Sequence, residues 1–369
     1  MSLPEPSFID RDPQAITAEI VAQYEQLTGK TLYPAQVERL LIDVIAYRET
    51  LVRIGIQEAA KQNLVAYARA PMLDYLGELV GVTRLPAQPA KTTLRFTFAA
   101  ALATNLLIPA GTRVEGGDGT ATFATDAEVT LLAGQLSIDA AATCEEPGAA
   151  GNAWQPGQIN NLVDDLGDFE VTAANTTVTS GGIEEEEDDR LRERIKLAPE
   201  AFSTAGSRLA YVFHAKSAHQ SIVDVAVLSP TPGVVKLYPL LTTGLPDANM
   251  LSLVEATCSA DRVRPLTDQV QALAPTPIDY AIDAQLVLYK NTDVASVLAQ
   301  AQAATEAYKA NRAAGLGRDI VPSQIVAALS VTGVYRVDLL APVATLEVGE
   351  NGWAHCTAID VQLAGNSDG

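Results

Sequence analysis

The chain has 369 residues, 48% of them hydrophobic and 19% charged, so it can bury enough apolar surface to fold and is too long for one ordinary domain. Its 25 Lys and Arg face 45 Asp and Glu, and the formal net charge of -20 argues against nucleic acid as a partner. No apolar run approaches the roughly 20 residues that span a bilayer, so we expect no direct membrane insertion. The start lacks the features of a signal peptide and the three cysteines lie far apart, which predicts synthesis in a reducing cytoplasm.

The first part of the chain carries apolar residues at helical spacing. Asp12 followed by Pro13 is typical of a helix start, and Gly29 of a helix end. A second pattern begins at Pro34 and runs to about Ala70, which predicts a helix of roughly 50 Å at 1.5 Å per residue. So long a helix has few neighbours in its own chain. Its apolar stripe therefore needs cover from the following domain or from partner helices.

The pattern changes from helical to alternating after a short third helix. That helix is predicted over residues 71–82, and Pro86 and Pro89 mark a boundary behind it. From Thr92 to Thr179 the sequence alternates and is rich in β-branched residues, which predicts a β-rich domain.

Six consecutive acidic residues, Glu184 to Asp189, open the next predicted helix. Acid at the start of a helix and base further along suit the helix dipole. Glu186 with Arg190, and Asp188 with Arg192, stand four residues apart and are expected to pair on one helix face. We interpret the block as a solvated helix start. The alternative is a charged contact with a neighbouring subunit.

Two later segments each show a helix followed by a strand, Ile222 to Pro230 in one and Val334 to Pro342 in the other. They predict two small α/β units of similar plan, each with helices on one face of a sheet. The expected fold class is therefore α+β and multidomain. The expected domains are an N-terminal helical bundle segment at 1–88, a β-rich domain at 89–181, and α/β domains at 182–274 and 275–369.

The sequence contains no complete motif for phosphate binding, zinc binding or serine-hydrolase catalysis. Gly29-Lys30-Thr31 resembles the end of a phosphate-binding loop, but Tyr24 stands where that loop needs a glycine. The three histidines lack the spacing of zinc ligands, and no Gly-x-Ser-x-Gly elbow is present. We predict no catalytic residue, no metal site and no cofactor, and expect that the protein is not an enzyme.

Four phrases, in order over roughly residues 35 to 345, resemble the J-type baseplate wedge family of contractile phage tails and related contractile injection particles. The phrases are Ala70-Pro71-Met72-Leu73-Asp74-Tyr75-Leu76-Gly77 with Gly81-Val82-Thr83-Arg84; Ile108-Pro109-Ala110-Gly111-Thr112-Arg113-Val114; Gly181-Gly182 through Arg194 with Gly206, Tyr211 and Val223-Asp224-Val225; and Gly317-Arg318-Asp319-Ile320-Val321-Pro322-Ser323 with Gly333-Val334. Their order along the chain is more specific than any one of them.

The resemblance implies a structural role without covalent chemistry. Two copies of such a chain join one I-type partner through N-terminal helices, while their other domains contact neighbouring wedges, the hub and sheath-initiating proteins. The ring so formed transmits the trigger for sheath contraction. The implied location is the virion tail baseplate, after assembly in the host cytoplasm. The residues implied to face the bundle are Val37, Leu41, Val44 and Leu51. The charged positions implied to lie at subunit contacts are Glu186, Asp188, Arg190 and Arg192.

Two alternatives come from other functional classes. The β-rich region could be a tail-associated binding module, such as an adhesin or carbohydrate-binding domain, which should present clustered exposed aromatics. A hydrolase of the cell envelope is the third hypothesis, and activity on peptidoglycan would distinguish it.

Overall fold

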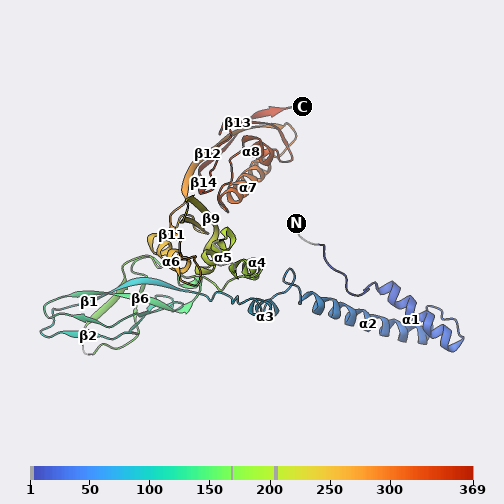
Figure 1. Ribbon diagram of the computed structural model, residues 1–369, viewed down its shortest axis with the longest axis horizontal. Coiled ribbons are helices and arrows are strands. Elements are labelled where there is room, and N and C mark those ends of the chain that lie inside the picture. Colours follow the sequence, from blue (N-terminus) through green and yellow to red (C-terminus); the bar gives the residue numbers. More distant parts are fainter. Residues whose placement is uncertain (1–3, 168, 203–206, 369) are drawn as a thin grey trace. The chain divides into compact units, whose positions relative to one another are not determined.

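The computed structural model describes residues 4–167, 169–202 and 207–368, and shows a mixed α+β multidomain chain, as predicted (Figure 1). It forms two compact units. The first consists of Met1–Arg84 together with Glu187–Ala198, and the second of Leu85–Glu186 together with Pro199–Gly369. Because the first unit takes residues from both sides of the β-rich region, that region is an insert in the sequence of the helical unit.

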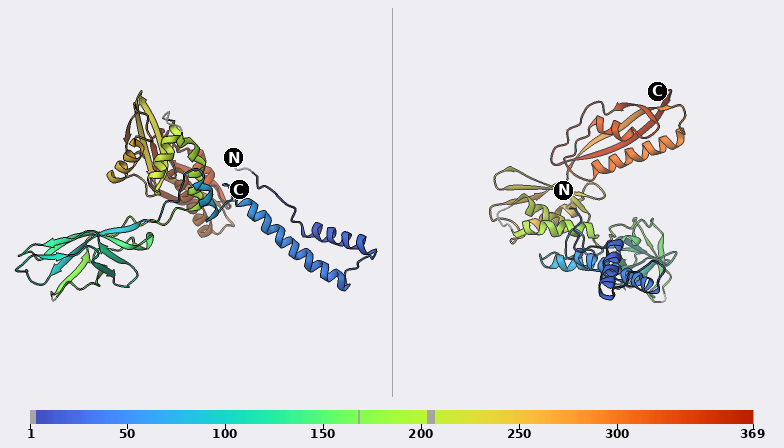
Figure 2. Two further views of the ribbon diagram at one scale, coloured as in Figure 1. Left: turned by 60° about the horizontal axis from the view of Figure 1, so that its bottom comes forward. Right: turned by 90° about the vertical axis from the view of Figure 1, so that its right-hand side faces the viewer.

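Helix α1 spans Pro13–Thr28 and has the predicted ends. The Asp12 side chain accepts a hydrogen bond from Gln14 N, and Gly29 closes the helix in the left-handed conformation with φ of 68°. Helix α2, which follows, lies beside α1 (Figure 2). Ile16 of α1 is buried between them.

Helix α2 spans Val37–Lys61 and is shorter than predicted at both ends. Its 25 residues extend about 38 Å at 1.5 Å per residue, and the predicted extension to Ala70 is wrong. Asn63 explains the stop, because its Nδ2 donates to Ala59 O at 3.0 Å and so occupies a carbonyl at the end of the helix.

One face of α2 is covered by residues that precede it. Ile42, Ala46 and Thr50 are buried on this side. Further along, Gln57 is fully buried and holds the segment before α1: its Oε1 accepts from Phe8 N at 2.9 Å and its Nε2 donates to Pro6 O at 2.7 Å. The N-terminal segment and α1 therefore occupy the same face of α2.

Helix α3, Met72–Glu78, and helix α4, Asp188–Leu197, complete the first unit. The chain after α3 turns at Gly81, with φ of 73°. Gly77 permits close packing, because a Cβ there would lie 2.7 Å from Val82 O and 3.2 Å from the Cδ1 of Ile195 on α4. Helix α4 thus packs on α3 although about a hundred residues separate them in sequence.

The β-rich domain is a nearly closed barrel with its core inside. Its strands are β1 Pro89–Phe98, β2 Leu106–Ile108, β3 Arg113–Gly116, β4 Thr122–Thr125, β5 Val129–Leu131, β6 Ser137–Pro147, β7 Ile159–Leu162 and β8 Val171–Asn175, with a short 3₁₀ helix at Ala149–Gly151. Six of them form one sheet in the order β7-β3-β4-β6-β1-β8, and β2 pairs with β5. Asn175 links the two edges of the large sheet, since its Oδ1 accepts from Ile159 N at 2.9 Å.

The next domain follows a short 3₁₀ helix at Ala198–Phe202. Its elements are α5 Arg208–Ala218, β9 Ile222–Thr231, β10 Val234–Leu241, α6 Ala248–Ser259 and β11 Gln269–Ala272. The sheet order is β11-β10-β9, with β10 parallel to β11 and antiparallel to β9. Tyr211, Ile222 and Val254 belong to its core.

The last domain has the elements β12 Thr276–Tyr289, α7 Val294–Ala313, α8 Pro322–Leu329, β13 Val334–Ala341 and β14 Gly352–Ser367. The sheet order is β13-β12-β14, and α7 lies along one face, as expected (Figure 2). In both α/β domains the central strand has one parallel and one antiparallel neighbour. The central strand is the second strand of one domain and the first of the other, so the two plans are similar only in part.

Candidate partner interface

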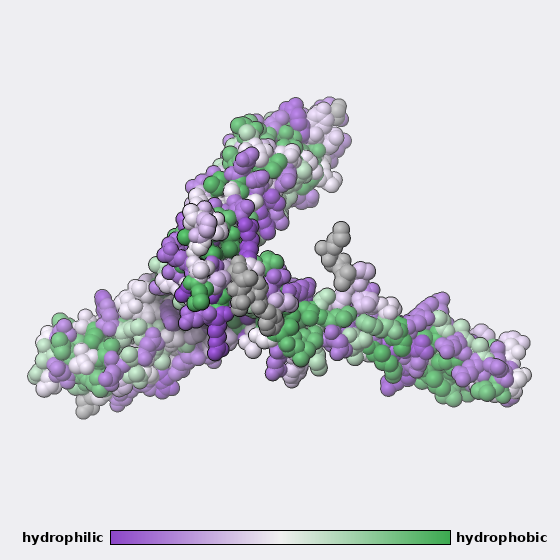
Figure 3. Space-filling model, viewed as in Figure 1, coloured by the Kyte–Doolittle hydropathy of each residue, from purple (hydrophilic) through white to green (hydrophobic). Residues whose placement is uncertain are grey.

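The face of α2 that α1 leaves open is apolar and exposed. All four residues that the sequence implied for a bundle lie on it: Val37 is 79% exposed, Leu41 62%, Val44 60% and Leu51 42%. Figure 3 shows hydrophobic residues gathered over this helical region on the face in view. Side chains of this kind are normally buried, and a contiguous exposed row of them is typical of interaction surfaces.

The same surface has further members, which are Leu40, Ile45, Tyr47, Val52, Ile54 and Ile56, all at least 42% exposed. The apolar pattern of the sequence included Leu40, Ile45 and Val52, and it missed Tyr47, Ile54 and Ile56. One row, with successive spacings of three and four residues, contains Val37, Leu40, Val44, Tyr47, Leu51 and Ile54. A second row contains Leu41, Ile45, Val52 and Ile56. We call the ten residues together the α2 open face. At 100° per residue they cover an arc of about 200° on the side opposite Ile42 and Ala46.

The acidic block at the start of α4 is a packed junction, and its interpretation as a solvated helix start is wrong for two of its residues. Glu186 is 3% exposed, and its Oε2 accepts from Leu85 N at 3.0 Å. Asp188 does not pair with Arg192. Its Oδ1 accepts from Arg84 Nη2 at 2.7 Å, and its Oδ2 accepts from Ala70 N at 3.2 Å.

Arg84 joins Asp188 to Asp74 of α3. Its Nε and Nη2 donate to Asp74 at 2.7 and 3.0 Å, and the arginine side chain is only 11% exposed. This contact lowers the pKa of Asp74 below its ordinary value, through the hydrogen bonds from Arg84 first and its positive charge second. The bridge therefore holds residues before and after the β-rich insert together, within the first unit.

Arg192 adds a second set of contacts between α4 and the chain after α2. Its Nε donates to Val65 O and its Nη2 to Ala68 O, both at 2.8 Å, and its Nη1 contacts Asp189. Arg190 is half-buried on the same helix. The contacts of Asp188 and Arg192 described here lie within the first unit.

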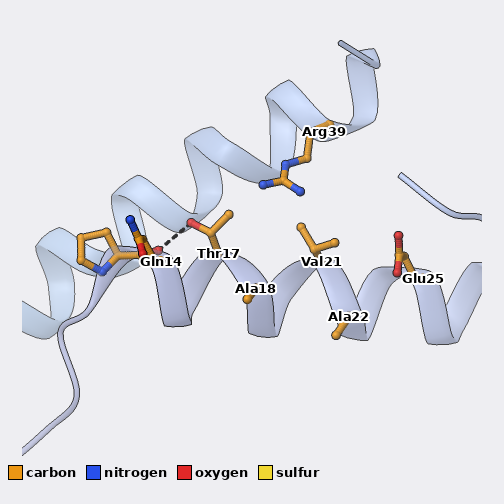
Figure 4. Close-up of a pocket in the computed structure, with 8 residues that line it drawn as sticks. Gln14, Thr17, Ala18, Val21, Ala22, Glu25 and Arg39 are labelled. Atoms are coloured by element: carbon orange, nitrogen blue, oxygen red, sulfur yellow. Dashed lines mark hydrogen bonds between the residues drawn. The ribbon is translucent and has the colours of Figure 1, made fainter. Parts of the chain in front are cut away.

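Other features of the described residues do not form a chemical site. A groove of about 570 Å³ lies between α1 and α2, where Thr17 Oγ1 donates to Pro13 O at 2.7 Å and Glu25 faces the same space as Arg39 (Figure 4). Among the described residues, no three His, Cys, Asp or Glu are grouped as metal ligands, and no helix has the length and apolarity to cross a membrane. Gly206, part of the third family phrase, lies outside the described residues.

Family models of baseplate J-like proteins match the chain in four consecutive parts. The matches are the N-terminal domain at residues 38–91, the barrel domain at 93–182, the central domain at 203–274 and the C-terminal domain at 280–362. Baseplate protein J of Escherichia phage P2 is 35% identical over 185 residues, which cover 50% of this chain and 61% of that protein. The match thus spans about six-tenths of that relative.

A solved structure with a similar fold is the cryo-EM structure of the anti-feeding prophage baseplate, six-fold symmetrised. One of its chains has a TM-score of 0.51, with 94% of this chain and 90% of that chain covered. At 14% identity the likeness concerns the fold alone.

A chain of several linked small domains with an exposed apolar helix face has the make-up of a structural assembly protein. The four family-model matches identify the family: the chain belongs to the baseplate J-like family.

Proposed function

We propose that this protein is a structural wedge component of a contractile-tail baseplate, without catalytic activity. Through the α2 open face it joins one I-type partner and a second copy of itself. Its other domains contact neighbouring wedges, the hub and sheath-initiating proteins, and pass on the trigger for contraction. The protein would be assembled in the host cytoplasm and reside in the tail baseplate. The α2 open face is the observation that carries the proposal.

The width of this face supports two partner helices. A helix that packs on one neighbour needs an apolar stripe of about 100°, and the α2 open face covers about twice that arc. Its first row also has the alternating spacing of three and four residues that coiled-coil seams use. Two added helices, side by side on this face, would place α2 at the centre of a bundle.

The amount of apolar surface is sufficient for association. The ten side chains are 42–79% exposed, and covering each would contribute on the order of 1 kcal/mol. Their sum, on the order of 10 kcal/mol, is comparable with the 4–15 kcal/mol cost of immobilising partners, so the whole face is needed for a stable complex.

We also propose that Glu186, Asp188, Arg190 and Arg192 serve subunit contacts indirectly. The hydrogen bonds of Asp188 and Arg192 fix α4 against residues 65–84, directly beyond the end of α2. By holding these residues in place, α4 would fix the orientation of α2 and thus the direction in which its open face meets a partner.

The test is light scattering after size exclusion, with and without the I-type protein of the same phage or injection particle. The variants are a truncation that lacks residues 1–61, which keeps Val65 and Ala68 for Arg192, and the point variant Leu51→Glu. Val178→Glu is the matched control, because Val178 is 45% exposed on the β-rich domain. We expect the full chain and the control to form a defined complex with the partner. The truncation and Leu51→Glu should not bind it. A complex that survives both changes in α2 would refute the proposal.

The binding-module alternative has less support from the structure. Of the aromatics that the β-rich domain could present, Phe96, Phe98 and Phe123 are buried and Trp154 is partly buried, so only Phe169 is well exposed. A single exposed ring does not make the aromatic cluster that such a module requires.

A further inference from the structure

Arg48 lies in the middle of the α2 open face. The four residues one turn away on the helix surface are Val44, Ile45, Leu51 and Val52, and all are exposed and apolar. A cation at the centre of an apolar surface becomes costly when a partner covers that surface, unless the partner supplies an opposite charge.

The other arginines of α2 have partners in the chain. Arg39 Nε contacts Asp43 at 3.0 Å, and Arg53 Nε contacts Glu49 at 2.8 Å. Among the residues that the structure describes, none with a carboxylate lies within ion-pair distance of the Arg48 guanidinium. Within the described part of the chain, Arg48 therefore has no carboxylate partner, unlike Arg39 and Arg53.

Gly55 stands two turns after Arg48 in the same line. Glycine inside a helix costs about 0.5–1 kcal/mol relative to alanine, and this one has no close approach to explain it within the chain, since a Cβ there would meet nothing within 4 Å. Its missing side chain leaves a gap between Leu51 and Val52 on one side and Glu58 and Ala59 on the other, and Glu58 is paired with Lys61. A helix that docks here can fill the gap with a large side chain.

We infer that the line through Arg48 and Gly55 receives a helix of the I-type partner that carries an Asp or Glu opposite Arg48 and a large apolar residue opposite Gly55. Two turns separate the positions on α2, so the two partner residues stand about seven apart in their own sequence. A second copy packed parallel and in register on this line would place Arg48 against Arg48, which disfavours it. This inference rests on the proposed function and adds the side-chain chemistry that makes the face specific for the I-type partner.

The experiment measures the affinity of the full chain for the I-type protein by titration calorimetry. The variants are Arg48→Met and Arg48→Glu, whose new side chains favour a helix as arginine does. The control is Lys30→Glu, which makes the same charge change in the loop before α2, away from the open face. We expect Arg48→Met to weaken binding on the order of 100-fold, because the partner's carboxylate is left buried without a counter-ion. Arg48→Glu should weaken it further, and Lys30→Glu by less than about twofold.

Charge reversal on the partner completes the test. Each Asp and Glu of its helices that has a large apolar residue seven positions away is changed to Arg, and one such change should restore binding to Arg48→Glu while weakening the wild type. Gly55→Leu should weaken binding on the order of 10-fold while slowing amide hydrogen exchange in the free α2, because the same side chain that blocks the gap favours the helix.

The outcomes separate the two proposals. If the wild type does not bind the I-type protein, the proposed function and this inference both fail. If the wild type binds, Leu51→Glu does not, and both Arg48 variants bind normally, the bundle stands and the role of Arg48 is refuted. If the Arg48 variants lose only self-association, the occupant is a second copy and the assignment to the I-type partner is wrong.

Discussion

Arg84 is predicted to stabilise the first unit far more than an exposed arginine of the same geometry. Its guanidinium makes three hydrogen bonds of 2.7–3.0 Å to Asp74 and Asp188, and its side chain is 11% exposed. Hydrogen bonds to charged groups contribute about 1.5–3 kcal/mol each, but both carboxylates are about one-third exposed and water would replace part of the loss. We expect Arg84→Gln to destabilise the packing of α4 on α3 by about 2–4 kcal/mol.

Arg95→Gln is the matched control. Arg95 also binds an aspartate through two nitrogens, at 2.7 and 2.8 Å to Asp139, but it is 51% exposed. An exposed pair of this kind contributes at most about 1 kcal/mol. Amide hydrogen exchange resolves the domains separately, which a single unfolding curve of a multidomain chain does not.

The assay compares exchange in Asp188–Leu197 and Met72–Glu78 between Arg84→Gln and wild type, with β1 and β6 compared for Arg95→Gln. The first change should speed exchange at least about tenfold. Arg84 lowers the pKa of Asp74, so its stabilising effect is present above the unfolded pKa and is lost as pH falls below the ordinary range of an aspartate. The difference between Arg84→Gln and wild type should therefore shrink below about pH 4. Equal effects of the two arginine changes would show that burial of the bridge does not matter.

Two further predictions concern the second unit. Gly182→Ala should destabilise the β-rich domain by about 1–3 kcal/mol, because a Cβ at Gly182 would lie 2.2 Å from Gly148 O. Amide hydrogen exchange in β1 and β6 should be faster than in the control Gly117→Ala, whose Cβ would meet nothing within 4 Å. Burial lowers the pKa of His214 below 6.5, so the stability that depends on its neutral form is present above that pH and is lost as the pH falls below it. His214→Leu should reduce the loss of stability between pH 7 and pH 5, measured by amide hydrogen exchange in α5 after correction for the intrinsic effect of pH on exchange. An unchanged pH dependence would contradict this account.

The sequence by itself determined the local elements whose signals are carried by neighbouring residues. Asp12 and Gly29 set the ends of α1 through a side-chain cap and a left-handed turn. Helical spacing places Val37, Leu41, Val44 and Leu51, the residues that the family resemblance implied for a bundle, on one side of α2, because helical geometry fixes which residues share a face. Their contact with a partner stays a prediction. The four family phrases likewise depend only on residue order.

The tertiary structure decided what those elements contact. Charge spacing predicted that Asp188 pairs with Arg192 one turn away, whereas the carboxylate binds Arg84, which is 104 residues away in sequence. The apolar pattern also failed to predict that α2 ends at Lys61, because this end depends on the side chain of Asn63. Spacing fixes which side chains share a helix face, but an ion pair forms with whichever charge the folded chain brings within about 3 Å at the least loss of hydration. That choice is made by long-range packing, here of α4 on α3, which a local pattern does not encode.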